Sequence, residues 1–401
     1  MLDNRYTDYM FGLVKTVIDE IGPRPSCSED EKRLGRLLVE EWKSICDRID
    51  VETFTCSPSA FLGFIPLAVL LYFAAVILYW FFPPLSLVMI TIMLSVSILE
   101  LNYREFVDFL FPRKQGENII GVIQPKGEVN RRVVVSAHLD SAYEFNLFYY
   151  LKNAAIPILA IAILGLVMAF GGSLAKTIAY GTGTDNAQVF TVIGIITVAL
   201  SPVVGLLLFF HTYRPVPGAM DNMAGIAVVS GLGKYLNEAK SNGNWLPEKT
   251  EVVLLATSSE EAGLRGAKRY VSKHLTEMKE TPTYGLLLDC IYDEKFLTVA
   301  KREIFTGATH DHDMVKMAQE VAAIHSWPIA AKVIPVGATD ASAFSLRGIP
   351  SICLLCQDIS RLVPNYHTRN DTYEYIRPES LSVSLQVVID MIERIDRIDR
   401  N

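Results

Sequence analysis

Four long apolar segments restrict the folds open to this chain more than any other feature of its sequence. Residues 53–99 contain no charged side chain, and Pro83-Pro84 divides this stretch in two. Two further segments follow, of which the second is neutral apart from His211. A helix that crosses a bilayer needs roughly 20 apolar residues. We therefore predict four transmembrane helices, at residues 60–82, 85–99, 154–175 and 186–213.

The composition supports a chain that is part membrane protein and part globular domain. Hydrophobic residues make up 50% of the sequence and charged residues 20%, with a mean hydropathy of +0.27. Buried core helices are the alternative for the apolar segments, but core helices of this length normally keep a polar face. The net charge of −7 disfavours nucleic acid as a partner, because phosphate binding requires a basic surface. The lipid bilayer is the expected partner of the apolar segments.

The rest of the sequence has the pattern of an α/β domain. Short apolar runs bounded by turn residues predict strands, and stretches with helical periodicity lie between them. Strands that alternate with helices predict a mainly parallel sheet covered by helices on both faces. The predicted strands are residues 48–54, 118–123, 132–137, 251–257, 284–288 and 351–355, and the predicted helices are residues 8–20, 29–45, 225–239, 264–279, 314–324 and 380–398.

Each pair of apolar segments forms a hairpin that returns the chain to the side of the membrane it left. The remaining pieces, residues 1–59, 102–150 and 214–401, can therefore form one domain, interrupted by hairpins at 60–101 and 151–213. The loops opposite this domain carry only Lys176 as a basic residue. Because basic flanks favour the cytoplasmic side, we expect an integral, multi-pass membrane protein with a cytoplasmic α/β domain. The basic residues on the domain side are Arg104, Arg113, Lys114, Lys152 and Arg214.

Residue types that bind metals follow several of the predicted strands. In an open α/β sheet, ligands bind beyond the carboxyl ends of the strands. The residues found there are His138 and Asp140, Glu260 and Glu261, Asp289 and, after a short loop, His367. Asp221 lies at a turn-to-helix junction just past the second apolar pair. Singly, each could be a core histidine, a helix cap or a solvated carboxylate, but their recurrence at one edge of the sheet indicates a metal site.

These motifs resemble those of the co-catalytic zinc aminopeptidases (metallopeptidase family 28), which are related to glutamate carboxypeptidase and, more distantly, to glutaminyl cyclase. The resemblance covers nearly all of the sequence outside the apolar segments. The departures are the two hydrophobic insertions and Met223-Ala224-Gly225, where members usually carry a small-residue pair before the glycine. The matching motifs are Ile21-Gly22-Pro23-Arg24-Pro25, Asn118-Ile119-Ile120-Gly121, His138-Leu139-Asp140, Gly218-Ala219-Met220-Asp221-Asn222, Glu260-Glu261, Leu288-Asp289 and Tyr366-His367-Thr368.

The resemblance implies a fold and a set of metal ligands. The fold would be a zinc-aminopeptidase-like three-layer α/β sandwich with a mainly parallel mixed sheet, plus the four inserted transmembrane helices. Asp221 would bridge two zinc ions per chain. His138 and Asp289 would complete one site, and Glu261 and His367 would complete the other. Mixed nitrogen and oxygen ligands suit zinc and leave each ion an open position for water.

Three further residues would act around the metals. Glu260 would be the general base on the water between the two ions. Asp140 would accept the second ring N–H of His138 and so fix its tautomer. Tyr366 would donate a hydrogen bond to the developing oxyanion, with a purely structural phenol as the open alternative.

Several other polar motifs have structural interpretations. His310-Asp311-His312-Asp313 cannot turn four consecutive side chains toward one ion, so we interpret it as the polar start of a helix. Asp340 lies in a loop where the family carries an aspartate, and we expect it to support the site or the fold. Cys353 and Cys356 have the spacing of a zinc knuckle, but they lie in an apolar run without a second pair, so we expect buried thiols in a strand.

The expected function is that of a membrane-anchored, zinc-dependent exopeptidase of the aminopeptidase type, in which the α/β domain is catalytic. His138, Asp140 and Asp221 lie a short stretch of chain from apolar segments, so hydrophobic peptides are expected among the substrates. Two alternatives stay open. The first is a metal-dependent amidohydrolase or an acyl- or amino-transfer enzyme acting on lipid amides. The second is a non-catalytic scaffold subunit, against which the complete set of ligands and base argues.

Overall fold

The computed structural model describes residues 2–184, 186–357 and 365–398. Its contacts divide the chain into two units. The α/β unit comprises Met1–Pro58, Arg113–Tyr143 and Arg214–Asn401. The helical unit comprises Ser59–Pro112 and Glu144–Tyr213.

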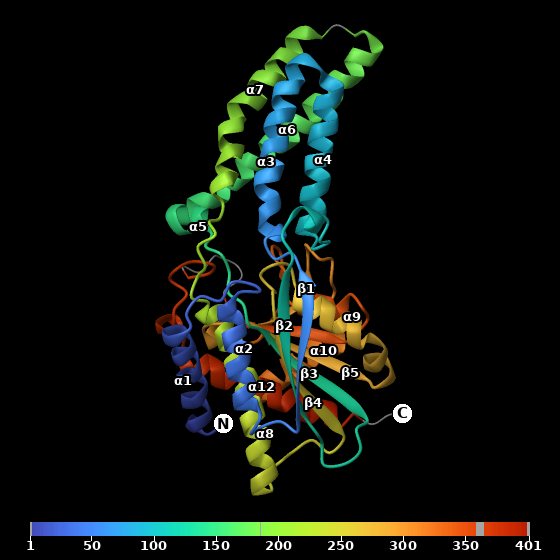
Figure 1. Ribbon diagram of the computed structural model, residues 1–401. Coiled ribbons are helices and arrows are strands. Elements are labelled where there is room, and N and C mark those ends of the chain that lie inside the picture. Colours follow the sequence, from blue (N-terminus) through green and yellow to red (C-terminus); the bar gives the residue numbers. More distant parts are fainter. Residues whose placement is uncertain (1, 185, 358–364, 399–401) are drawn as a thin grey trace. The chain divides into compact units, whose positions relative to one another are not determined.

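A mixed sheet of eight strands runs through the described part of the α/β unit (Figure 1). Its strands are β1 (Arg48–Cys56), β2 (Lys114–Ile123), β3 (Arg131–His138), β4 (Thr250–Thr257), β5 (Thr283–Ile291), β6 (Leu297–Glu303), β7 (Ala330–Ile334) and β8 (Ser351–Cys356). Their order across the sheet is β1-β2-β4-β3-β5-β8-β6-β7. The four central strands β4, β3, β5 and β8 are parallel, so their carboxyl ends meet at one edge of the sheet.

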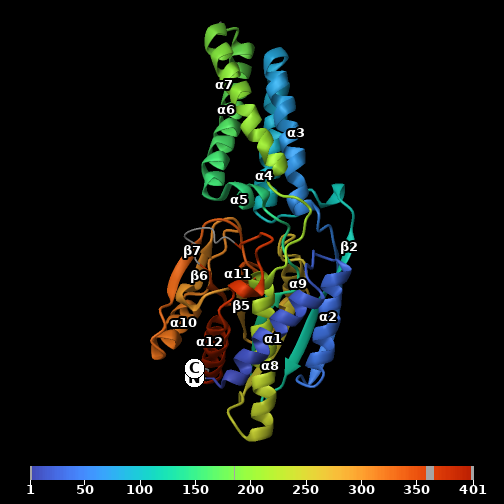
Figure 2. The same cartoon turned by 90° about the vertical axis from the view of Figure 1, so that its left-hand side faces the viewer.

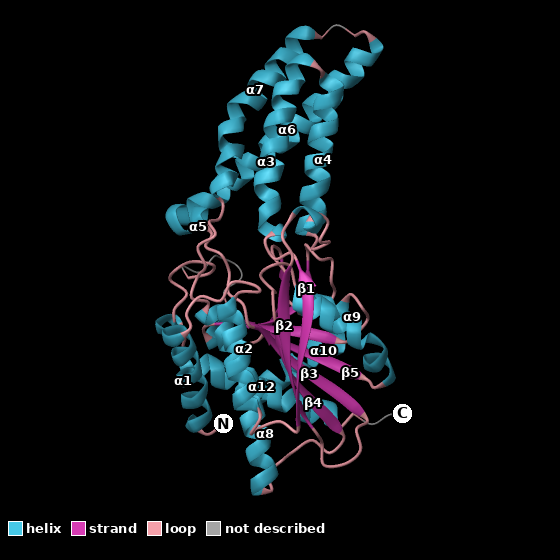
Figure 3. Cartoon of the chain, in the orientation of Figure 1, coloured by secondary structure: helices cyan, strands magenta, loops and turns pink. Residues whose placement is uncertain are grey.

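Helices cover both faces of this sheet, as Figures 2 and 3 show. The helices are α1 (Asn4–Glu20), α2 (Glu29–Trp42), α8 (Ala224–Asn242), α9 (Arg265–Glu280), α10 (His312–Ile324), α11 (Ala341–Ser345) and α12 (Pro378–Asp396). One core lies under α1, α2, α8, α10 and α12, and a second core lies under α9 and α11. Two buried cores on opposite faces of one sheet make a three-layer sandwich. The predicted mainly parallel sheet with helices on both faces is therefore confirmed.

Two strands escaped the sequence-based prediction. β6 begins with the apolar run Leu297–Ala300, but its second half is charged, and β7 is a five-residue strand at the edge of the sheet. A short edge strand such as β7 buries few side chains and so lacks the apolar run that marks a central strand, whereas the charged second half of β6 interrupts its apolar pattern. β6 runs antiparallel to β8, and β2 runs antiparallel to both β1 and β4, so the sheet is mixed.

The helical unit contains four helices, within its described residues, that are long and apolar enough to cross a membrane. They are α3 (Ala60–Phe81), α4 (Pro83–Leu101), α6 (Ala155–Thr182, preceded by the short α5, Asn146–Leu151) and α7 (Ala187–Gly205). Their mean hydropathies range from 2.0 to 2.6. An apolar helix thus occupies each of the four predicted segments, and α4 and α6 extend beyond the predicted segments 85–99 and 154–175.

Small and hydroxyl side chains let these helices approach closely. The hydroxyls of Ser86 and Ser173 lie 2.8 Å apart, and both residues are buried. A Cβ atom on Gly172 would lie 2.6 Å from the side chain of Ile193, so only glycine fits at this contact. Close packing and interhelical hydrogen bonds of this kind are what hold helices together in lipid.

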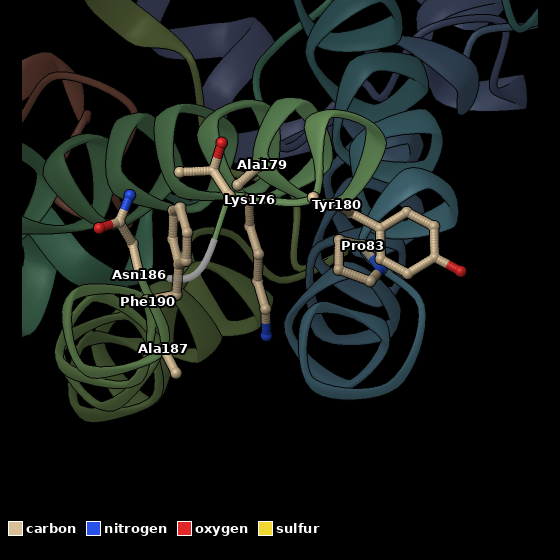
Figure 4. A pocket seen from close by; sticks show the side chains of 9 residues that line it. Pro83, Lys176, Ala179, Tyr180, Asn186, Ala187 and Phe190 are labelled. Atoms are coloured by element: carbon tan, nitrogen blue, oxygen red, sulfur yellow. The ribbon is translucent and has the colours of Figure 1, made fainter.

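A pocket of about 360 Å³ lies where α6, α7 and the start of α4 meet (Figure 4). Lys176, which we had counted as a loop residue, belongs to α6 and lines this pocket. Its ammonium group donates to the main-chain oxygen of Tyr79 at 2.8 Å and lies 4.3 Å from the centre of that ring. The other lining residues are Pro83, Ala179, Tyr180, Gly183, Thr184, Asn186, Ala187 and Phe190.

The helical unit also includes residues that we had placed in the α/β domain, namely 102–112 and 144–150. The first of these segments is tied to the ends of α3 and α4. The main-chain N–H of Val107 donates to the carboxylate of Glu100 at 2.8 Å, and the ring of Phe111 lies against Gly63. Such contacts between a flank and its own helices are not visible in hydropathy.

Candidate metal centre

The carboxyl ends of the four central strands carry most of the predicted site residues. β3 ends at His138, and Glu260 and Glu261 follow β4 after two serines. Asp289 lies near the end of β5, and His367 follows β8. Because these strands are parallel neighbours, residues far apart in sequence meet at one edge.

Asp221 reaches the same place from the turn Ala219–Met223, which precedes α8 and has a cis peptide bond between Asp221 and Asn222. Two features hold this turn. Gly218 has a φ of +67°, and a Cβ atom there would lie 2.5 Å from Ser141, so a glycine is required. The buried carboxylate of Asp371 accepts the main-chain N–H groups of Met220 at 2.8 Å and Asp221 at 3.1 Å.

Asp221 stands between the two histidines. Its Oδ1 lies 3.1 Å from Nε2 of His138, and its Oδ2 lies 3.0 Å from Nε2 of His367. Oε1 of Glu261 is 3.3 Å from His367, whereas Oδ1 of Asp289 is 3.8 Å and Oε2 of Glu260 is 3.9 Å from His138. The structure thus divides these side chains into one group around each histidine, with the Asp221 carboxylate shared between the groups.

Burial and mutual repulsion shift the pKa values of these carboxyl groups. Desolvation raises the pKa of Glu261 to about 7. Desolvation raises that of Glu260 well above its usual range, and the charges of Glu261, Asp289 and others add to this. Asp221 differs: burial opposes its ionisation, but hydrogen bonds from both histidines bring its pKa below the usual value. Burial would lower the pKa of His367, yet Glu261 and Asp221 raise it to about 10.

These residues fit divalent cations. Oδ1 of Asp289 and Oε1 of Glu261 are buried and accept no hydrogen bond from the described residues, as expected of oxygens that bind a metal. The ligand atoms of His138, Asp221 and Glu261 lie within 4.8 Å of one another, as do those of His138, Glu260 and Asp289. A cation would take the place of the protons that the crowded carboxyl groups otherwise hold.

Asp140 has more partners than the sequence suggested. Nδ1 of His138 lies 3.0 Å from the main-chain oxygen of Asp140 and 3.5 Å from its carboxylate, so the ring N–H donates to the main chain. Nε2 of His138 therefore remains for the carboxylates of Asp221, Glu260 and Asp289. The carboxylate of Asp140 instead accepts the main-chain N–H groups of Glu260 at 3.0 Å and Glu261 at 3.1 Å, and the hydroxyl of Ser26. Asp140 therefore positions both glutamates.

Two supporting residues had no role in the sequence analysis. Arg24, fully buried, donates to the main-chain oxygens of Gly22, Leu139, Pro217 and Gly218, and so ties the His138 segment to the Asp221 turn. Asp371 is the other. A charged residue in the Ile21–Pro25 motif was a signal for Arg24, whereas nothing in the sequence marks Asp371 except its place four residues after His367.

The other singled-out residues lie as follows. The ring of Tyr366 stacks on that of His367 with centroids 4.1 Å apart. Asp340 is buried and accepts the hydroxyl of Thr257 at 2.5 Å. Asp311 caps α10 by accepting the N–H of Met314 at 2.9 Å, which confirms the predicted polar helix start. The predicted buried thiols of a strand are also confirmed, and they are Cys353 and Cys356 on β8.

Solved structures with this fold include zinc aminopeptidases. A zinc aminopeptidase from Bacillus subtilis matches with a TM-score of 0.57 at 14% identity, covering 97% of this chain and 94% of that protein. A glutaminyl cyclase from an Acidobacteriales bacterium matches with a TM-score of 0.58, also at 14% identity, covering 98% of this chain and 95% of that one. The predicted aminopeptidase-like fold is therefore confirmed.

The sequence comparison gives the family. Residues 204–392 match the model of peptidase family M28. The chain is also 23% identical over 207 residues to aminopeptidase NAALADL1 of Rattus norvegicus. That match covers 46% of this chain and 28% of the rat protein, so it spans little more than a quarter of the relative's length. The predicted resemblance to metallopeptidase family 28 is confirmed over these residues.

Proposed function

We propose that the chain is a membrane-anchored exopeptidase of the aminopeptidase type that depends on two zinc ions. The observation that carries the proposal is the position of Asp221, whose two carboxylate oxygens each contact a different histidine. One carboxylate shared between two ligand groups is what a pair of neighbouring metal ions requires. His138 and Asp289 would hold one ion, and Glu261 and His367 the other.

The chain's own residues divide the remaining work. Zinc, when bound, lowers the pKa of water and polarises the carbonyl of the scissile amide. Glu260 takes a proton from the attacking water and passes it to the leaving amine as the C–N bond breaks. Asp140 keeps Glu260 in place through its main-chain N–H. Tyr366 borders the site through its stacking on His367 and donates its hydroxyl to the oxyanion.

The membrane part of the proposal rests on the four apolar helices and on sequence separation. Asp140 precedes the helical unit by four residues, and Asp221 follows it by eight. Extended chain spans at most about 3.5 Å per residue, so both are tethered by short segments. We accordingly propose that the substrates include hydrophobic peptides, and that the α/β unit is cytoplasmic, as the basic flanks favour.

A substrate screen with metal analysis tests this proposal. The full chain, purified in detergent, would be incubated with amino-acid amides, peptides and N-acyl amides while bound metal is measured. We expect release of N-terminal residues by protein that carries about two zinc ions, and loss of release after chelation. Cleavage of N-acyl amides alone would replace the proposal with a lipid amidohydrolase.

The same screen separates hydrolysis from group transfer. An added amine acceptor should leave the products unchanged if water is the only acceptor. Appearance of an acyl-amine product would identify a transferase. Protein that binds zinc but cleaves none of the substrates would support the scaffold alternative.

A further inference from the structure

Cys290 directly follows the proposed ligand Asp289 and lies among the carboxylates of the metal centre. In a regular strand two consecutive side chains point to opposite faces of the sheet. Here the pairing of β5 with β8 shifts register between Asp289 and Ile291, and Cys290 has a φ of +49°. The shift breaks the alternation, so the two neighbouring side chains converge.

The thiol therefore lies where a ligand would lie. The sulfur of Cys290 and carboxylate oxygens of Asp221 and Asp289 all lie within 4.8 Å of one another. A sulfur and an oxygen donor of one tetrahedral zinc ion are roughly 3.6 Å apart, since zinc lies roughly 2.3 Å from sulfur and 2.0–2.2 Å from oxygen. Separations of up to 4.8 Å reach that distance with movements of about 1 Å.

The surroundings of Cys290 single it out from the other cysteines. Among the described residues, it is the one cysteine in a group that could hold a metal. Its side chain is 4% exposed and packs against Met220. Tyr292 and Tyr366 pack against Cys290 and Met220. The neighbouring Oδ1 of Asp289 accepts no hydrogen bond from the described residues. A buried sulfur next to an unsatisfied carboxylate oxygen is a donor set for a soft or borderline cation.

We propose that Cys290, as its thiolate, supplies a sulfur ligand to the metal ion held by Asp221 and Asp289. The inference rests on the proposed two-metal function. On binding, the S–H bond breaks, the proton leaves to solvent, and the sulfur lone pair forms the bond to the ion. Thiolate ligation favours zinc and cadmium over manganese and magnesium, so this centre selects its ion by chemistry that the oxygen and nitrogen ligands do not provide.

Cadmium reports sulfur ligation directly through a thiolate-to-cadmium charge-transfer band in the ultraviolet. The metal-free full chain in detergent would be titrated with Cd²⁺ while absorbance and bound cadmium are recorded. We expect the band to appear with the intensity of one thiolate per chain. Cys290→Ser should abolish the band while cadmium still binds through the remaining ligands. Cys353→Ala is the matched control and should keep the band, because Cys353 is a buried cysteine of β8 that belongs to none of the candidate metal groups of the described residues.

The outcomes separate this inference from the proposed function. Two cadmium ions without the band would refute the sulfur ligand and leave the two-metal proposal standing, whereas absence of bound ions would overturn both. A band that survives Cys290→Ser but disappears in Cys27→Ala would assign the sulfur elsewhere. If the Cys290 variants do not fold, X-ray absorption on the zinc-loaded wild-type chain decides, because a sulfur scatterer at about 2.3 Å is either present or absent.

Discussion

Replacing Asp140 with asparagine tests whether the site is held by the main chain of its two glutamates. The Asp140 carboxylate is fully buried and accepts the N–H groups of Glu260 and Glu261 at 3.0 and 3.1 Å. Asparagine has nearly the same shape, but one of its two terminal atoms is a donor. In Asp140→Asn that amide nitrogen faces a main-chain N–H, so one hydrogen bond is lost and the other no longer has a charged acceptor.

The magnitude follows from these two bonds. A hydrogen bond to a charged group contributes roughly 1.5–3 kcal/mol. We expect Asp140→Asn to lower the free energy of unfolding by about 2–3 kcal/mol, which corresponds to a fall in Tm of roughly 3–5 °C for an α/β unit of this size. A displacement of Glu260 on the order of 1 Å would also cost about 100-fold in turnover. Tm would be measured by fluorescence in detergent with zinc present, because zinc balances the acidic charges.

Asp47→Asn is the matched control. Asp47 accepts the N–H of Gln124 at 2.7 Å and the ammonium of Lys240 at 2.6 Å, but its side chain is 41% exposed. Exposed pairs contribute about 0–1 kcal/mol, so Asp47→Asn should change Tm little. Equal shifts in the two variants, or an unchanged Tm in Asp140→Asn, would refute the positioning role of Asp140.

Four further predictions follow from the site and the topology. Glu260→Gln should lower turnover by roughly 100- to 10,000-fold at unchanged zinc content. Glu261→Gln should lose zinc, and its turnover should recover partly when zinc is added. The reverse pattern would exchange the roles of the two glutamates. Asp221→Ala should lose both ions, and retention of one by metal analysis would contradict a shared carboxylate. Desolvation raises the pKa of Glu261 from 4.5 to about 7. Between these pH values the folded metal-free protein holds a proton that the unfolded chain releases, so its Tm should fall as the pH rises from 4.5 to about 7. A Tm that rises over this pH range would contradict the prediction. Cysteines at the exposed residues Thr184 and Asn242 should label from opposite sides of the membrane, and labelling from one side would contradict the paired hairpins.

The sequence could predict the elements whose signal is local. The central strands are apolar runs that end in ligand-type residues, and parallel pairing alone brings His138, Glu260 and Asp289 to one edge. The long apolar helices are equally visible, since no polar face interrupts them. The central strands, the apolar helices and these three site residues can therefore be predicted from residue type and position along the chain.

The sequence could not predict what depends on contacts distant in the chain. Asp371 supports Asp221 across 150 residues, and Arg24 reaches Gly218 across 194. Nothing near either residue indicates such a partner. The same limit applies to Ser86 and Ser173. In the sequence they are isolated polar residues in apolar segments, and only the structure shows their hydroxyls 2.8 Å apart.

The pairing of the sheet explains how four helices can be inserted into an aminopeptidase fold. Cys56 at the end of β1 pairs with Lys114 at the start of β2, so the first insertion takes the place of a hairpin loop. Tyr143 forms an antiparallel bridge with Pro215, so the second insertion also begins and ends at one point of the α/β unit. Closing a loop costs only about 0.6 kcal/mol for each doubling of its length, and pairing at the base already fixes the ends. The sheet register and the metal ligands can therefore persist whatever length of chain leaves and returns at these two points. Helices that cross a membrane would have to do so an even number of times within each insertion, because both ends of the insertion are held by the same unit.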